Sequence, residues 1–164
     1  MRRKVLLIVV AVAVVALTAW FAFAAVTWKS GPTGTFSANN TSFTITGEAS
    51  GLGNTPAIAH VTVNGTVTYT CENKGGNQSP GQNPVPASST FDQNLGNSDH
   101  NGRGVLNVTA SISASATVSG DVAGCPNGNW KGVNPQPFPV PITSAVVTIT
   151  QGGKTIFGPM TYTP

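Results

Sequence analysis

The chain of 164 residues carries eight Lys and Arg against five Asp and Glu, a formal net charge of +3. Arg2, Arg3 and Lys4 precede the first apolar run, so residues 25–164 hold five basic and five acidic side chains and are neutral overall. A neutral chain without a basic cluster lacks the charge that binding to a phosphate backbone requires, which argues against nucleic acid as a partner.

The composition argues against a helical fold. The sequence contains 19 Gly and 12 Pro, and after residue 30 it is rich in Thr, Ser, Asn and Val, without helical apolar periodicity. Breakers and β-branched side chains at this density disfavour helices. The length after residue 24 suits one domain, so we predict a single all-β domain over residues 36–164.

The first segment predicts export. Residues 1–24 have the form of a signal peptide, with a basic start, an apolar core and small residues at Ala22 and Ala24 that place cleavage before Ala25. The alternative is an uncleaved anchor over residues 5–26, long enough to span a bilayer. The domain is therefore expected outside the cytoplasm, either secreted or held by this single membrane pass.

The start of the exported part predicts a flexible leader and then two strands. Residues 25–35 have leader composition, Phe36 opens a first short strand, and residues 39–40 make a turn. Residues 41–50 alternate at period two. The inward set is Phe43, Ile45, Gly47 and Ala49.

The clearest pattern lies in residues 57–71, where one parity carries nearly all the apolar side chains. Such alternation predicts a strand, or a hairpin bent at residues 64–65. Ile58 is the apolar exception on the outer face. The inward set is Ala57, Ala59, Val61, Val63, Gly65, Val67, Tyr69 and Cys71.

The alternation stops after Cys71. Residues 72–85 are almost all Asn, Gly, Gln, Pro and Ser, which predicts a long surface loop. A short strand is expected at 89–92, at a sheet edge because Pro84 and Pro86 precede it. Residues 95–104 predict a second polar loop.

The remaining strands are expected in the C-terminal third of the chain. Alternation over residues 106–118 predicts one strand with mostly small inward residues, and 125–130 reads as a loop. Alternate prolines in 135–141 predict an extended crossover or edge. Residues 143–151 and 154–163 predict a hairpin turning at two glycines.

These elements number about seven strands, spaced as in an antiparallel immunoglobulin-like β-sandwich. No Trp lies between the two cysteines, so the pattern of antibody domains is absent.

In an exported chain the pair Cys71 and Cys125 most simply forms one disulfide. Free thiols or metal ligation are the alternatives. We expect no cofactor.

The sequence offers little that resembles catalysis. His100 next to Asp99 could serve a hydrolase, but no Ser lies in a nucleophile frame, and His60 falls on an outward strand face. Asn97, Asp99 and Asn101 match the first half of a calcium loop. The glutamate that completes such loops is missing, so an ordinary turn is the favoured interpretation and no metal site is predicted.

The long loop and Trp130 are the candidate binding features. Trp130 follows Cys125 closely and could pack on the disulfide or stack on a sugar ring. The polar residues nominated for binding lie in the loop after Cys71. They are Asn73, Asn77, Gln82 and Asn83.

Three motifs carry a resemblance to a known group of proteins. They are Gly51-Leu-Gly-Asn54, Cys71-x-Asn-x-Gly-Gly-Asn77-Gln-x-Pro-Gly-Gln-Asn-Pro84 and Cys125-Pro-Asn-Gly-Asn-Trp130. Together, over about residues 36–162, the chain resembles small exported actinobacterial proteins of unassigned function. The resemblance implies an exported β domain with a single disulfide and transfers no catalytic residue.

The sequence therefore predicts a non-catalytic extracellular or cell-surface module. It would bind an unknown extracellular partner, a glycan or a cell-wall component through the 72–85 and 95–104 loops and Trp130. The alternative prediction is a secreted hydrolase that uses His100 and Asp99.

Overall fold

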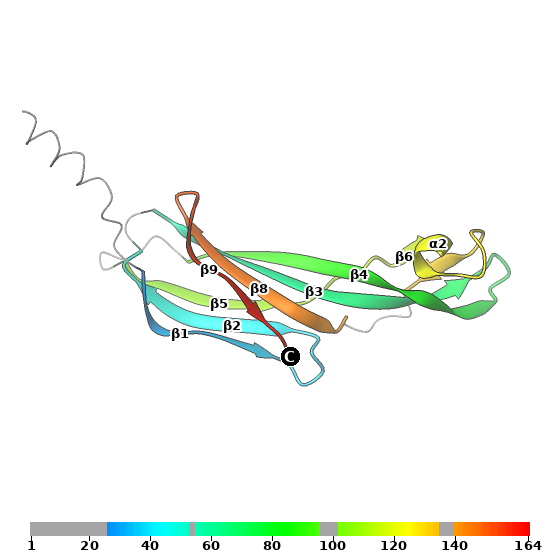
Figure 1. The fold of residues 1–164 in the computed structure, drawn as a ribbon, viewed down its shortest axis with the longest axis horizontal. Coiled ribbons are helices and arrows are strands. Elements are labelled where there is room, and N and C mark those ends of the chain that lie inside the picture. The colour runs from blue at the N-terminus through cyan, green and yellow to red at the C-terminus, as the bar shows by residue number, and fades with distance from the viewer. Residues whose placement is uncertain (1–25, 53–54, 96–101, 135–139) are drawn as a thin grey trace, which may run out of the picture.

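The computed structural model describes residues 26–52, 55–95, 102–134 and 140–164. The segment predicted as a signal peptide, residues 1–24, lies outside them. The described residues form nine antiparallel strands and one short helix (Figure 1). In chain order these are β1 (Thr27–Phe36), β2 (Phe43–Ser50), β3 (Ala57–Glu72), β4 (Gln78–Asn94), β5 (Gly104–Ala110), β6 (Thr117–Ser119), α2 (Gly120–Ala123), β7 (Lys131–Val133), β8 (Ile142–Gln151) and β9 (Lys154–Tyr162).

The strands make two sheets. One has three strands in the order β1-β2-β5. The other has six and is built on β3, which pairs with β4 along one side and with β8 and then β7 along the other. β9 extends the sheet beyond β8, and β6 extends it beyond β7. The predicted class, an all-β antiparallel sandwich with one disulfide, is confirmed.

The core lies between the facing sides of the sheets. It is a single cluster of buried side chains that runs from Ala57 at the start of β3 to Tyr69 and Cys71 near its end. The described residues contribute no fully buried polar or charged side chain to it. Burial of apolar surface is therefore the main force that holds the two sheets together.

The alternation predicted for residues 57–71 is confirmed as one continuous strand, and the hairpin alternative is wrong. β3 runs without a turn through residues 64–65, where only its register with β8 shifts. Its odd-numbered residues through Cys71 are buried or nearly so, and its even-numbered residues face outward. The predicted hairpin of β8 and β9 is confirmed as well.

The predicted surface loop over residues 72–85 is wrong from Gln78 on. β4 begins there and pairs with β3 along its length, so the predicted strand at 89–92 is one part of a much longer element. Among the described residues β4 pairs with β3 alone, which makes it an edge strand as predicted. Pro84 and Pro86 are two residues apart and direct their nitrogens to the same side, so both can face the free edge without losing a ladder bond.

The flexible leader predicted over residues 25–35 is wrong from Thr27 on, because these residues form β1. Shifts in register near Ser30 and Thr33 accommodate the Gly31-Pro32 step that broke the sequence pattern. The inward Trp28 packs edge-on against Phe157 of β9, with ring centroids 5.2 Å apart.

The single strand predicted over residues 106–118 is also wrong, because β5 ends at Ala110. Burial still alternates through Ile112, and the N–H of Ser113 donates to Ser89 Oγ on β4 at 3.2 Å. The side chains of residues 111–113 therefore keep the two-residue alternation of a strand, although their backbone no longer pairs with β2. With the short strands β6 and β7 included, the described residues form nine strands, whereas about seven were predicted.

Within the described ranges, no helix is long and apolar enough to cross a membrane.

Candidate functional site

The end of the β3–β4 hairpin forms a distinct part of the molecule. We define the distal lobe as residues 66–72 of β3, 78–86 of β4 and the segment 115–133. Figure 1 shows α2 and β6 beside this end of the hairpin, away from β1 and β2. The short strand β7 joins the segment to the hairpin through pairing with β3, in which Cys71 faces Gly132 and Glu72 faces Lys131.

A bulge in β4 shapes the lobe. Thr68 pairs with Pro84 and Thr70 with Pro80, so three residues of β4 lie opposite Tyr69. Gly81 is required here, since a Cβ would come within 2.4 Å of the Tyr69 carbonyl oxygen. The bulge directs Asn83 toward α2, where its Nδ2 lies 3.4 Å from two backbone carbonyl oxygens. Asn83 therefore holds the helix in place.

The predicted disulfide is confirmed and ties the same segment to β3. Cys71 and Cys125 are bonded, and Cys71 is completely buried. Cys125 follows Gly124, which ends α2 in the left-handed conformation with φ 66°. The Tyr69 hydroxyl donates to the Ser115 carbonyl at 3.0 Å, so the segment is held at both ends. The disulfide lies within the distal lobe and does not link the two sheets.

Two asparagine-centred turns meet at the tip of the lobe. In the turn between β3 and β4, Asn73 Oδ1 accepts hydrogen bonds from the backbone N–H groups of Gly75 (2.9 Å) and Asn77 (3.0 Å). In the other turn, Asn127 Oδ1 accepts from the N–H of Asn129 at 3.1 Å. These bonds fix the orientation of both side-chain amides.

A polar cleft of about 440 Å³ lies between the turns. Its aromatic wall is Trp130, which is half-buried and also packs against the core. Trp130 therefore both packs against the core and lines the cleft. The lining residues are Asn73, Lys74, Gly75, Asn127, Asn129 and Trp130.

One ion pair borders the cleft. Lys131 Nζ lies 3.2 Å from Glu72 Oε1, and Gln78 Nε2 donates to the other carboxylate oxygen at 3.5 Å. The hydrogen bond from Lys131, with that from Gln78, lowers the pKa of Glu72 below its usual value. Glu72 is therefore ionised at neutral pH, and Lys131 compensates its charge.

Replacing Lys131 by alanine is expected to raise the pKa of Glu72 back toward its ordinary value, because the main stabilising contact of the carboxylate is lost. In the wild type, a carboxyl group with a lowered pKa stabilises the fold at pH values above its pKa in the unfolded chain. This stabilisation is lost as the pH falls through its pKa in the folded protein. The wild-type β3–β7 contact should therefore loosen only in acid. Carboxyl-carbon NMR titration of Glu72 measures the shift, and Lys29→Ala should leave it unchanged.

The structure brings together part of the predicted set. Asn73 and Trp130 line the cleft, and Asn77 closes the turn beside it. Gln82 is exposed in the bulge, and Asn83 binds α2. The prediction missed four lining residues, although each falls within a motif that the sequence displays. These are Lys74, Gly75, Asn127 and Asn129.

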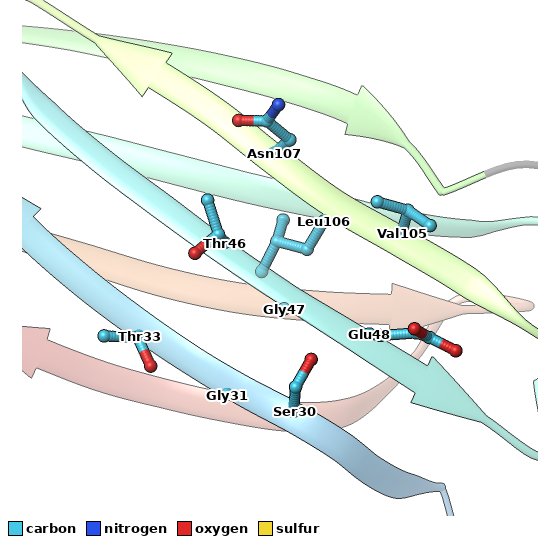
Figure 2. A pocket seen from close by; sticks show the side chains of 9 residues that line it. All are labelled: Ser30, Gly31, Thr33, Thr46, Gly47, Glu48, Val105, Leu106 and Asn107. Carbon is cyan, nitrogen blue, oxygen red and sulfur yellow. The ribbon is translucent and has the colours of Figure 1, made fainter.

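A second, smaller groove of about 330 Å³ crosses the outer face of the three-stranded sheet where β1 bulges (Figure 2). Figure 2 shows Ser30, Thr33 and Thr46 around it, with Glu48 at one end. The Glu48 carboxylate pairs with Arg103 and lies 3.8 Å from Lys29 Nζ. The groove has no aromatic side chain in its lining, and its polar groups come from Ser30, Thr33, Thr46, Glu48 and Asn107.

One hydrogen-bonded chain on the outer face of the larger sheet has the order of a hydrolytic triad. His60 Nδ1 lies 2.7 Å from Asp92 Oδ1, and His60 Nε2 lies 3.1 Å from Thr150 Oγ1. The three side chains come from the neighbouring strands β4, β3 and β8. The chain is a cross-strand network that stabilises the sheet.

The other predicted candidates fall outside the described residues. These are His100 and Asp99 of the hydrolase alternative, and Asn97, Asp99 and Asn101 of the weak calcium candidate. Within the described residues, no three His, Cys, Asp or Glu side chains gather in a way that could hold a metal ion. The hydrolase alternative stays a prediction.

No protein-family model matches the chain, and no curated protein matches it.

Proposed function

We propose that the protein is an exported, non-catalytic module that binds a glycan of the cell surface or cell wall through the distal cleft. The observation that carries the proposal is the meeting of one indole and three asparagine side chains in a single cleft at the tip of the lobe. A sugar ring presents C–H groups on its face and hydroxyl groups at its rim. An aromatic side chain suits the face, and amides suit the hydroxyls.

The size and construction of the cleft support this proposal. A volume of about 440 Å³ falls within the range of small-molecule sites and accommodates a sugar unit. The asparagine amides of both turns are oriented by backbone hydrogen bonds before any ligand arrives. Such preorganisation reduces the entropy lost on binding.

Export is supported separately. The Cys71–Cys125 disulfide is typical of proteins that fold in an oxidising compartment. The signal-like residues 1–24 and the resemblance to exported actinobacterial proteins point the same way. We therefore place the module outside the cytoplasm, secreted or anchored by its N-terminal segment.

Trp130→Ala is expected to weaken binding to cell-wall and surface polysaccharides at least about tenfold, because central aromatic residues dominate such contacts. A polysaccharide array, followed by calorimetry on any binder, measures the loss. Asn129→Ala, whose side chain makes no hydrogen bond to the described residues, tests the cleft without disturbing the core. It should also weaken binding.

Gln82→Ala is the matched control, because Gln82 is exposed on the same lobe but does not line the cleft. It should bind as the wild type does. Equal loss in all three variants, or binding that none of them changes, would place the site elsewhere. A wild-type protein that binds no polysaccharide in the array would refute the proposed function.

A further inference from the structure

In the distal cleft, the amide oxygens and amide nitrogens of Asn73 and Asn127 differ in the hydrogen bonds that they already make. Asn73 Oδ1 is occupied by two backbone N–H groups and Asn127 Oδ1 by one. The amide nitrogen of each side chain has no acceptor among the described residues. Asn73 has therefore committed its acceptor oxygen to the protein, Asn127 has committed part of its acceptor capacity, and both keep their Nδ2 donors for a ligand. The Asn129 amide, which makes no hydrogen bond to the described residues, can donate or accept.

Lys74 adds a cation to these donors. It is exposed at the rim of the cleft, and no carboxylate of the described residues lies within 4.0 Å of its ammonium. The nearest acid along the chain, Glu72, is engaged by Lys131 and Gln78. Asp121 lies close to Gly128 but does not line the cleft. The cleft thus carries a positive charge that no lining residue cancels.

Two oriented amide donors, one ammonium and no lining carboxylate complement a ligand rich in acceptors and negatively charged. The charge of the residues after position 24 is zero overall, so this local excess does not follow from a generally basic surface. We propose that the glycan bound in the distal cleft carries a carboxylate on the sugar that contacts Trp130, as in a polyuronate. This inference rests on the proposed function and specifies its ligand.

The experiment compares matched acidic and neutral polysaccharides. Polygalacturonate, alginate and hyaluronan are each tested against the full-length exported protein beside their carboxyl-reduced forms, together with neutral cell-wall glycans and a phosphodiester-linked glycan. We expect binding to at least one carboxylated polymer and at least tenfold weaker binding to its reduced form. The affinity should fall as salt rises, because a charge contact at an exposed rim is screened.

Lys74→Gln should weaken binding to the acidic polymer about fivefold and leave binding to its reduced form unchanged, as expected for one partly exposed charge. Lys29→Gln removes the same charge from β1, far from the lobe, and should change neither. Both variants replace an exposed lysine by a neutral polar side chain and disturb no buried group.

The possible results separate the two proposals. Equal affinity for acidic and reduced polymers, or preference for the phosphodiester glycan, overturns the carboxylate inference and leaves the glycan-binding function standing. Binding to no polymer in the panel overturns both. An equal loss with Lys74→Gln and Lys29→Gln would show that overall charge, and not the cleft, attracts the polymer, and would overturn the inference.

Discussion

Replacing Cys71 and Cys125 together by alanine is expected to lower the free energy of unfolding by about 4 kcal/mol. The bond closes a loop over a sequence separation of 54, and the chain-entropy treatment gives this value for a loop of that length. Small domains are stable by only about 5–15 kcal/mol, so the double variant should lose a large share of the total. Urea denaturation followed by fluorescence measures the change.

The loss should appear first in the distal lobe. Without the disulfide, the segment 115–133 is held by the three-residue strand β7, by the Tyr69 hydroxyl and by the amide of Asn83. Hydrogen exchange should therefore accelerate in α2 and β7 before it does in β2. Because Trp130 lies in the same segment, glycan binding should weaken even at temperatures where the sandwich remains folded.

Two comparisons make this prediction decisive. The wild type kept reduced by excess thiol should lose a similar amount of stability, while Val122→Ala on the exposed side of α2 should change stability by less than about 0.5 kcal/mol. A loss below about 1 kcal/mol in the double variant would contradict the prediction. Uniform acceleration of exchange throughout the molecule would show that the lobe does not open separately.

Local pattern was sufficient to predict the central part of the fold. β3 could be recognised because it lies inside a sandwich with one covered face, so burial imposes a two-residue period on its sequence. The partner of Cys71 could be inferred because the chain has only one other cysteine. These features depend on composition and periodicity, which are visible without knowledge of pairing.

Most of β4 and of β1 escaped prediction because each is held by backbone pairing at an edge. The first half of β4 is polar and rich in proline, and its strand character comes from the ladder with β3. β1 contains the Gly31-Pro32 step within a shifted register, which hides its alternation. In both, tertiary pairing outweighs local propensity.

The candidate site was predictable only in part for a related reason. Asn73 and Trp130 were nominated from loop composition and from proximity to a cysteine. That Asn127 and Asn129 face Asn73 depends on the three-residue pairing of β7 with β3 and on the disulfide. A three-residue strand carries no periodic signal, so the sequence alone does not show that the two turns meet.

Replacing Phe43 by alanine is expected to cost about 3–5 kcal/mol, the usual loss for a large aromatic side chain removed from a core. Phe43 is completely buried on β2, and its ring lies 4.9 Å from that of Phe36 and 5.2 Å from that of Tyr162. Gly34 makes room for it, since a Cβ there would come within 2.6 Å of the Phe43 ring. The surrounding rings cannot all move into the space, so a cavity should remain.

The position of Phe43 determines which part of the molecule should weaken. Phe36 belongs to β1 and Tyr162 to β9, edge strands of different sheets, so this aromatic cluster joins the sheets where no ladder does. Hydrogen exchange should accelerate in β1 and β9. Thr46→Ala, on the exposed side of the same strand, should stay within about 0.5 kcal/mol of the wild type.

The Phe43 variant also tests whether sandwich and lobe are one cooperative unit. Their buried side chains form a single cluster, which favours one unfolding transition in the wild type. While folded, Phe43→Ala should keep wild-type affinity for the proposed glycan, because Phe43 packs against Phe36 and Tyr162 and does not line the cleft. The cysteine variant should lose affinity before it unfolds. A folded Phe43→Ala protein with impaired binding would contradict this expectation. It would mean that packing between the sheets, and not the disulfide and β7, positions Trp130 opposite Asn73.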